Sequence, residues 1–125
     1  MVTGIGEITP VLDAVALTGN AYDEVAASTV EISRNGADFA VVYPSFTIGD
    51  ATSATVEVAV SPDDGANYYA VAEQTYTATG TFRIPVEFAP GETKLRIRAK
   101  ANADGTTAVL SVGLRLSNLK YPIEN

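Results

Sequence analysis

Apolar and polar residues alternate along most of this chain with a period of two, the spacing of a β-strand that is buried on one face. In the clearest segment, Val56, Val58 and Val60 fall on one face. Thr55 and Glu57 fall on the other. The β-branched residues also favour a strand. The same pattern predicts eight strands, at 11–18, 26–33, 38–48, 54–61, 67–77, 81–88, 94–101 and 110–117.

Turn-forming residues separate these segments, among them Asn35-Gly36 and Pro90-Gly91. Short strands at regular spacing are typical of an antiparallel β-sandwich. Eight is the strand number of a jelly roll, so we predict an all-β fold with jelly-roll topology. An immunoglobulin-like sandwich is the alternative, although its antibody version has a core Trp and a Cys pair that this chain lacks.

The 125 residues fall within the usual size of one domain. We expect a single sandwich domain over residues 11–120. Two glycines and Pro10 interrupt the apolar residues before it, so residues 1–10 are predicted to form an extended arm. Residues 121–125 are predicted to be a C-terminal tail.

An Asp-Gly dipeptide at 104–105 lies between two alternating segments, which is a strong hairpin signal. A two-residue turn there predicts that the last two strands pair side by side. In that register Leu95 faces Leu114, and Lys94 lies beside Arg115.

Composition removes many kinds of chemistry. The chain has no His and no Cys. Zinc, copper and haem therefore lose their usual ligands, and a Ser-His-Asp or Cys-His mechanism lacks its imidazole base. We expect no catalytic residues, no metal ligands and no cofactor, so the chain is predicted not to be an enzyme.

The first residues lack the basic and apolar regions of a signal peptide, and no apolar run approaches a membrane span. We therefore expect synthesis in a cytoplasm and no membrane partner. The net charge of -7 also disfavours nucleic acid, whose binding depends on neutralising phosphates.

Charge is divided unevenly along the chain. Residues 1–82 contain eleven acidic residues and one basic residue, whereas residues 83–125 contain four acidic and seven basic residues. Four of these bases fall on one face of the strand at 94–101, with Arg115 expected beside them, and we call the four the basic row: Lys94, Arg96, Arg98 and Lys100. The row is interpreted either as a solvated outer sheet face or as an interface for an acidic partner surface, including another copy of this chain. An anionic polysaccharide is a third alternative, which the net negative charge disfavours.

A second candidate site follows the strand at 54–61. Asp63, Asp64 and Asn67 place three oxygen-bearing side chains in five residues, which suits calcium, but the spacing of an EF-hand is absent. A plain turn explains the same residues. Tyr68 and Tyr69 follow, and one of these rings could stack on a sugar, because adjacent strand residues point to opposite sides.

These residues also carry a resemblance. A strand ending in Ser61, a Ser-x-Asp-x-Gly turn, an aromatic strand and the later Leu95-Arg96-Ile97-Arg98 resemble jelly-roll modules in tailed-phage virion proteins and in some carbohydrate-binding modules. The similarity covers about residues 54–116 and is greatest to small capsid decoration, or cement, proteins. Such a family implies a homotrimer on the capsid lattice, partnered by the major capsid protein and by its own copies, with no catalytic residues.

We therefore expect a non-enzymatic structural protein of a phage virion that binds between capsid subunits and stabilises the head. Docking is assigned to the basic row, to Arg115, and to Ile5 and Ile8 of the arm. The alternative is a carbohydrate-binding module that uses the Tyr/Asp loop, and a glycan is a partner only in that case. The residues of that loop are Asp63, Asp64, Asn67, Tyr68 and Tyr69.

Overall fold

The computed structural model of this chain describes residues 8–17, 19, 20, 22, 27–32, 38–102 and 108–117. These residues contain no helix, and most of them lie in strands. The strands are β1 (Ile8–Leu17), β2 (Ala27–Glu31), β3 (Phe39–Thr47), β4 (Ala54–Ser61), β5 (Tyr69–Tyr76), β6 (Gly80–Thr81), β7 (Ile84–Glu87), β8 (Lys94–Ala101) and β9 (Ala108–Ser117).

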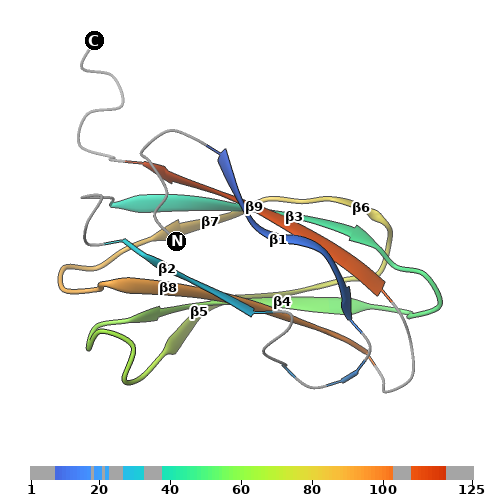
Figure 1. The fold of residues 1–125 in the computed structure, drawn as a ribbon, viewed down its shortest axis with the longest axis horizontal. Helices are drawn as coiled ribbons and strands as arrows, with labels where there is room; N and C mark the ends of the chain where they lie inside the picture. The colour runs from blue at the N-terminus through green and yellow to red at the C-terminus, as the bar shows by residue number, and fades with distance from the viewer. Residues whose placement is uncertain are drawn as a thin grey trace, which may run out of the picture.

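Two antiparallel sheets pack face to face, one above the other in Figure 1. Sheet A has the order β1-β9-β3, and both β6 and β7 pair with the free side of β3. Sheet B has the order β2-β8-β4-β5. Since β6 and β7 share one strand position, the sandwich has eight positions. Successive positions lie in different sheets except at the β4–β5 hairpin, which is the strand order of a jelly roll. This confirms the predicted all-β sandwich and its topology.

The core lies between the two sheets. Leu95 and Ile97 of β8 and Leu110 and Leu114 of β9 are fully buried there. They belong to one cluster that also contains the valines of β4. Period-two alternation therefore places one apolar face of each strand in a shared core, as the sequence predicts.

The predicted hairpin between the last two strands is wrong. Leu95 pairs with Val30 and Val60 in sheet B, whereas Leu114 pairs with Thr9 and Val42 in sheet A. The two strands lie in opposite sheets, and their apolar faces meet across the core. The dipeptide at 104–105 lies outside the described residues.

Strand β1 begins earlier than predicted. Ile8 pairs with Arg115, and Pro10 pairs with Gly113, so residues 8–10 belong to sheet A and not to an arm. Pro10 fits because β1 is an edge strand, where a missing N–H need not disturb a neighbour. Residues 1–7 of the predicted arm, Ile5 among them, and the tail at 121–125 lie outside the described residues.

The strand predicted at 81–88 is interrupted at residues 82–83. There Pro44 accepts a hydrogen bond from the Phe82 N–H at 2.8 Å. In an antiparallel ladder, the N–H and C=O of one residue point to the same neighbour, but proline has no N–H to donate. The ladder therefore stops at Pro44, and β6 and β7 are separate strands.

Among the described residues, no helix has the length and apolar character needed to span a membrane.

Candidate functional site

The basic row lies on the outer face of sheet B, where its two arginines contact Glu57 of β4. Arg98 donates two hydrogen bonds to this carboxylate, from Nε to Oε1 at 2.6 Å and from Nη2 to Oε2 at 3.2 Å. Arg96 donates to Oε1 from Nη2 at 3.4 Å. The side chain of Glu57 is only 10% exposed. The middle of the row is thus an ion-pair cluster between two strands.

Two tyrosines cover the same row. The guanidinium of Arg96 lies 4.4 Å from the ring centre of Tyr68, and that of Arg98 lies 4.2 Å from the ring centre of Tyr22. Lys100 Nζ is 4.9 Å from the Tyr22 ring, whose hydroxyl donates to Glu73. These distances are in the range of cation–π attraction.

This arrangement changes the electrostatics expected from sequence. The hydrogen bond from Arg98 is the largest cause that holds the pKa of Glu57 below its ordinary value, against the opposing effect of burial. Arg96 and Arg98 would repel each other, but both bond to the carboxylate of Glu57, which reduces this repulsion. Arg115 is not beside them: it lies on the outer face of sheet A, contrary to the prediction from the hairpin.

The outer face of sheet A has a different character. Its residues form rows across the sheet that we name the sheet-A face, and the charged residues in these rows are Arg115 and Glu87. The rows are Ser117, Phe39 and Glu87; Ile8, Arg115, Val41 and Pro85; Pro10, Gly113 and Tyr43; Ser111, Ser45 and Thr81; and Ala16, Val109 and Thr47. The structure thus brings together two predicted docking residues, Ile8 and Arg115, and separates both from the basic row.

Ile8 is the most prominent apolar side chain on this face. It is 61% exposed, and a Cβ placed on Gly113 would lie 3.1 Å from its Cγ2. The side chain of Ile8 therefore packs over Gly113, which has no side chain of its own. The guanidinium of Arg115 is 6.0 Å from the Tyr43 ring centre. Together these side chains form a mostly apolar surface with one cation, Arg115 of β9.

The loop after β4 is held by its own side chains. Ser61, fully buried, donates to Asp63 Oδ1 at 2.8 Å and accepts the Gly65 N–H at 2.8 Å. Asn67 donates its backbone N–H to Asp63 Oδ1 at 2.9 Å and its amide Nδ2 to Oδ2 at 2.7 Å. Asp64 and Gly65 have positive φ angles of 59° and 96°, as a tight turn requires.

These contacts bear on the predicted calcium and sugar residues. Both carboxylate oxygens of Asp63 already accept hydrogen bonds, chiefly from Asn67, and these lower its pKa. Asp64 points to Lys94, 3.8 Å away. Tyr68 covers Arg96, so Tyr69, 57% exposed, is the ring left free for a ligand. Among the described residues, no group of three acidic side chains could hold a metal ion.

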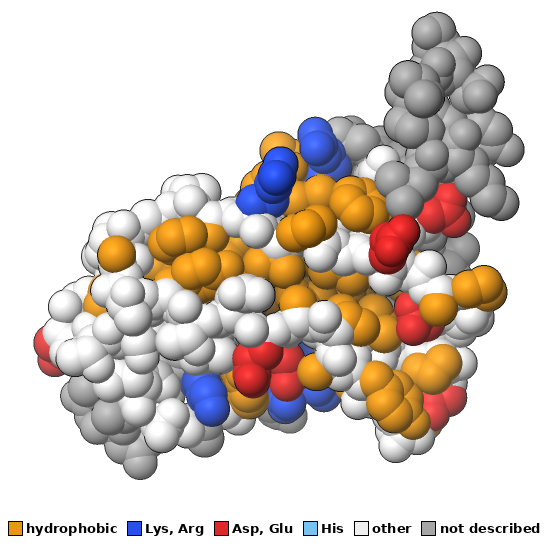
Figure 2. Space-filling model, turned by 180° about the vertical axis from the view of Figure 1, so that it is seen from behind, with side chains coloured by type: hydrophobic (Ala, Val, Ile, Leu, Met, Phe, Trp, Pro, Cys, Tyr) orange, Lys and Arg blue, Asp and Glu red, His pale blue; other side chains and the backbone are white. Residues whose placement is uncertain are grey.

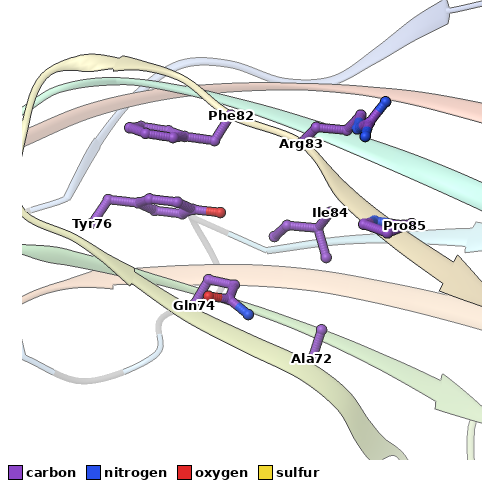
Figure 3. Close-up of a pocket in the computed structure, with 7 residues that line it drawn as sticks. All are labelled: Ala72, Gln74, Tyr76, Phe82, Arg83, Ile84 and Pro85. Carbon is purple, nitrogen blue, oxygen red and sulfur yellow. The ribbon is translucent and has the colours of Figure 1, made fainter.

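A cleft of about 490 Å³ opens along the sandwich edge, where β5 ends sheet B and β6 and β7 end sheet A. Figure 2 shows the molecule from this side, with hydrophobic side chains gathered along the seam between the sheets. At one end of the cleft the rings of Tyr76 and Phe82 stack with centres 4.0 Å apart, and Phe46 packs behind them. Figure 3 shows Ile84 between this ring pair and Pro85.

Three polar side chains line the same cleft. Gln74 comes from β5 below, the Tyr76 hydroxyl points along the cleft towards Ile84, and Arg83 extends from the opposite wall (Figure 3). Sequence reasoning missed Gln74 and Arg83, because two sheet edges far apart in the chain bring them together. Pro44 within a predicted strand was the available signal, since it marks where the opposite edge strand breaks.

No protein-family model matches the chain, and no curated protein matches it. Several solved structures have a similar fold. The K1 adhesin domain of Lys-gingipain from Porphyromonas gingivalis W83 is 16% identical, with a TM-score of 0.55 over 74% of this chain and 63% of that chain. PBSX exported protein XepA is 14% identical, with a TM-score of 0.56 over 90% of this chain and 38% of that chain.

A carbohydrate-binding module, CBM51 from a Clostridium perfringens GH95 protein in complex with methyl-galactose, is 17% identical. Its TM-score is 0.51 over 92% of this chain and 90% of that chain. This chain spans less than two thirds of the gingipain domain and of XepA. At these identities the likeness shows the fold, which is a β-sandwich module.

Proposed function

We propose that this chain is a non-catalytic structural protein of a phage virion, of the capsid decoration type, that docks on the head through the sheet-A face. The observation that carries the proposal is the contrast between the two outer faces. The sheet-A face presents an exposed Ile8 beside Arg115, with Glu87 as the other charged residue of its rows, whereas the opposite face is occupied by the Glu57 ion pairs.

Desolvation favours the sheet-A face as the docking surface. The centres of protein interfaces are depleted in charged residues, because each buried charge must find a partner. On this face a capsid subunit needs one acidic group for Arg115 and apolar contacts for Ile8. On the other face it would have to compete with Glu57 for Arg96 and Arg98, which are already hydrogen-bonded.

The alternative, a carbohydrate-binding module that uses the loop at 63–69, has weaker geometric support. A sugar would find the oxygens of Asp63 and the amide of Asn67 bonded to each other, and Tyr68 placed over Arg96. Tyr69 alone would remain as a stacking platform.

Docking can be tested with heads purified from a phage deletion strain that lacks this gene. The purified protein is mixed with the heads and sedimented. We expect the wild type to co-sediment, and the double variant Ile8→Ser/Arg115→Ser to bind at least about tenfold more weakly. Lys94→Ser, on the outer face of sheet B, is the matched control and should bind like the wild type. Failure of the wild type to bind, or equal loss in the control, would overturn the proposal.

A further inference from the structure

The cleft between β5 and β7 is lined by three polar side chains, of which those of Gln74 and Arg83 are exposed and that of Tyr76 is half-buried. Gln74, Arg83 and the Tyr76 hydroxyl form no hydrogen bond or ion pair with another described residue. The side chains of the Glu57 cluster and of the Asp63 turn, by contrast, form hydrogen bonds to one another. Three unpaired groups that line one hollow are the arrangement expected of a ligand site.

The chemistry of these groups describes the ligand. Arg83 offers only donors, in a planar fork that matches a carboxylate. Gln74 offers a donor and an acceptor, which suits a hydroxyl. Burial raises the pKa of Tyr76 above its ordinary value of 10, so its hydroxyl stays protonated at neutral pH and can donate. The ligand should therefore carry one carboxylate and several hydroxyls.

The remaining walls add a requirement for apolar surface. Ile84, which is buried, lies beside the Tyr76–Phe82 ring pair, and Pro85 lies beyond it (Figure 3). A pyranose ring has an apolar C–H face and a rim of hydroxyls, and it matches such a mixture of walls. A volume of about 490 Å³ lies within the range of small-ligand pockets.

We propose that this cleft binds a carboxylate-bearing pyranose, a uronic acid residue of a glycan, with its carboxylate at Arg83 and its hydroxyls at Gln74 and Tyr76. The overall charge of -7 does not oppose this, because Arg83 is the charged residue among those that line the cleft. At physiological salt, acidic residues farther from the cleft are screened and repel a bound carboxylate only weakly. The site is separate from the Asp63 loop and adjoins the sheet-A face at Pro85, on the edge away from Ile8.

Isothermal titration calorimetry with the intact protein tests this site, with D-glucuronate, D-glucose and acetate as probes. We expect glucuronate to bind at least about tenfold more tightly than glucose, and acetate not to bind measurably. Tyrosine fluorescence gives a second readout, since the chain contains six Tyr and no Trp. Glucuronate should change this signal through Tyr76.

Two variants assign the contacts. Arg83→Gln should reduce glucuronate affinity to about that of glucose and leave glucose binding unchanged. Tyr76→Phe keeps the ring stack and should weaken both sugars by a few-fold. Arg115→Gln, an exposed arginine on the sheet-A face, is the control and should bind glucuronate like the wild type.

Equal affinity for glucose and glucuronate, no loss in Arg83→Gln, or no binding of glucuronate at millimolar concentration would each overturn the inference. Virion docking is measured on a different face with different variants. Either proposal can therefore fail without affecting the other.

Discussion

Arg98 and Glu57 form a bidentate ion pair that joins β8 to β4 on the outer face of sheet B, with Nε 2.6 Å from Oε1. This pair explains why a row of bases is tolerated on one strand. It also pairs the charges of Arg96 and Arg98 within the chain. The sheet-A face and the edge cleft are therefore the surfaces that we consider for partners.

Removing the charge of Glu57 should destabilise the fold. In Glu57→Gln, the amide nitrogen would point at the guanidinium of Arg98, and two poorly exposed arginines would lose their counter-charge. We expect a loss of about 2 kcal/mol in the free energy of unfolding, measured by urea denaturation. Glu87→Gln, at an exposed position of β7, is the control and should change stability by less than about 0.5 kcal/mol. Equal stability of the two variants would contradict the role of Glu57.

The same carboxylate predicts a pH dependence. The pKa of Glu57 is lower in the folded protein than its ordinary value of 4.5, mainly because of the Arg98 hydrogen bond. Its contribution is therefore complete above about pH 5 and is lost as the pH falls through the lowered folded pKa. The stability gap between wild type and Glu57→Gln should stay constant from about pH 6 to 8 and shrink below about pH 4. If the difference in free energy of unfolding between wild type and Glu57→Gln is as large at pH 3 as at pH 7, the ion pair is not the cause of that difference.

Asn67 should control the ionisation of Asp63. Its side-chain hydrogen bond is the largest cause of the lowered Asp63 pKa. Asn67→Ala should raise that pKa towards its ordinary value of 3.8, as followed by NMR titration of the carboxyl carbon. The wild type, titrated under the same conditions, is the reference. An unchanged Asp63 titration would mean that the Asn67 amide does not bond to it in solution.

The ring pair at the end of the cleft should stabilise the sandwich edge. Phe82→Ala removes a half-buried ring that stacks on Tyr76 and lies 6.4 Å from Phe46. We expect a loss of about 2 kcal/mol, less than for a fully buried phenylalanine. Tyr69→Ala, which removes a mostly exposed ring of β5, is the matched control and should cost less than about 0.5 kcal/mol. If both variants lose the same stability, the ring stack contributes nothing specific.

Local alternation was sufficient to predict the strands and the faces that they bury. Val56, Val58 and Val60 are buried as predicted, and Glu57 lies on the opposite face with the basic row. Such a pattern reports which side of a strand is apolar. It does not report which strand lies beside it, because β8 and β9 can bury their apolar faces side by side or across a core.

The candidate sites were harder to predict for a related reason. The sequence shows that Arg96 and Arg98 share a face, but not that Glu57 lies in the strand next to them. The cleft depends on Pro44 interrupting the ladder and on two sheet edges meeting, which are tertiary relationships. Ile8 and Arg115, predicted separately as docking residues, became one surface only once β1 was placed beside β9.

The orientation of the protein on a phage head tests the central claim most directly. A cryo-electron microscopy reconstruction of heads that carry this protein should show Ile8 and Arg115 against the capsid shell, with the Glu57–Arg98 face towards solvent. A reconstruction with the Glu57–Arg98 face against the shell, or heads without density for the protein, would contradict it.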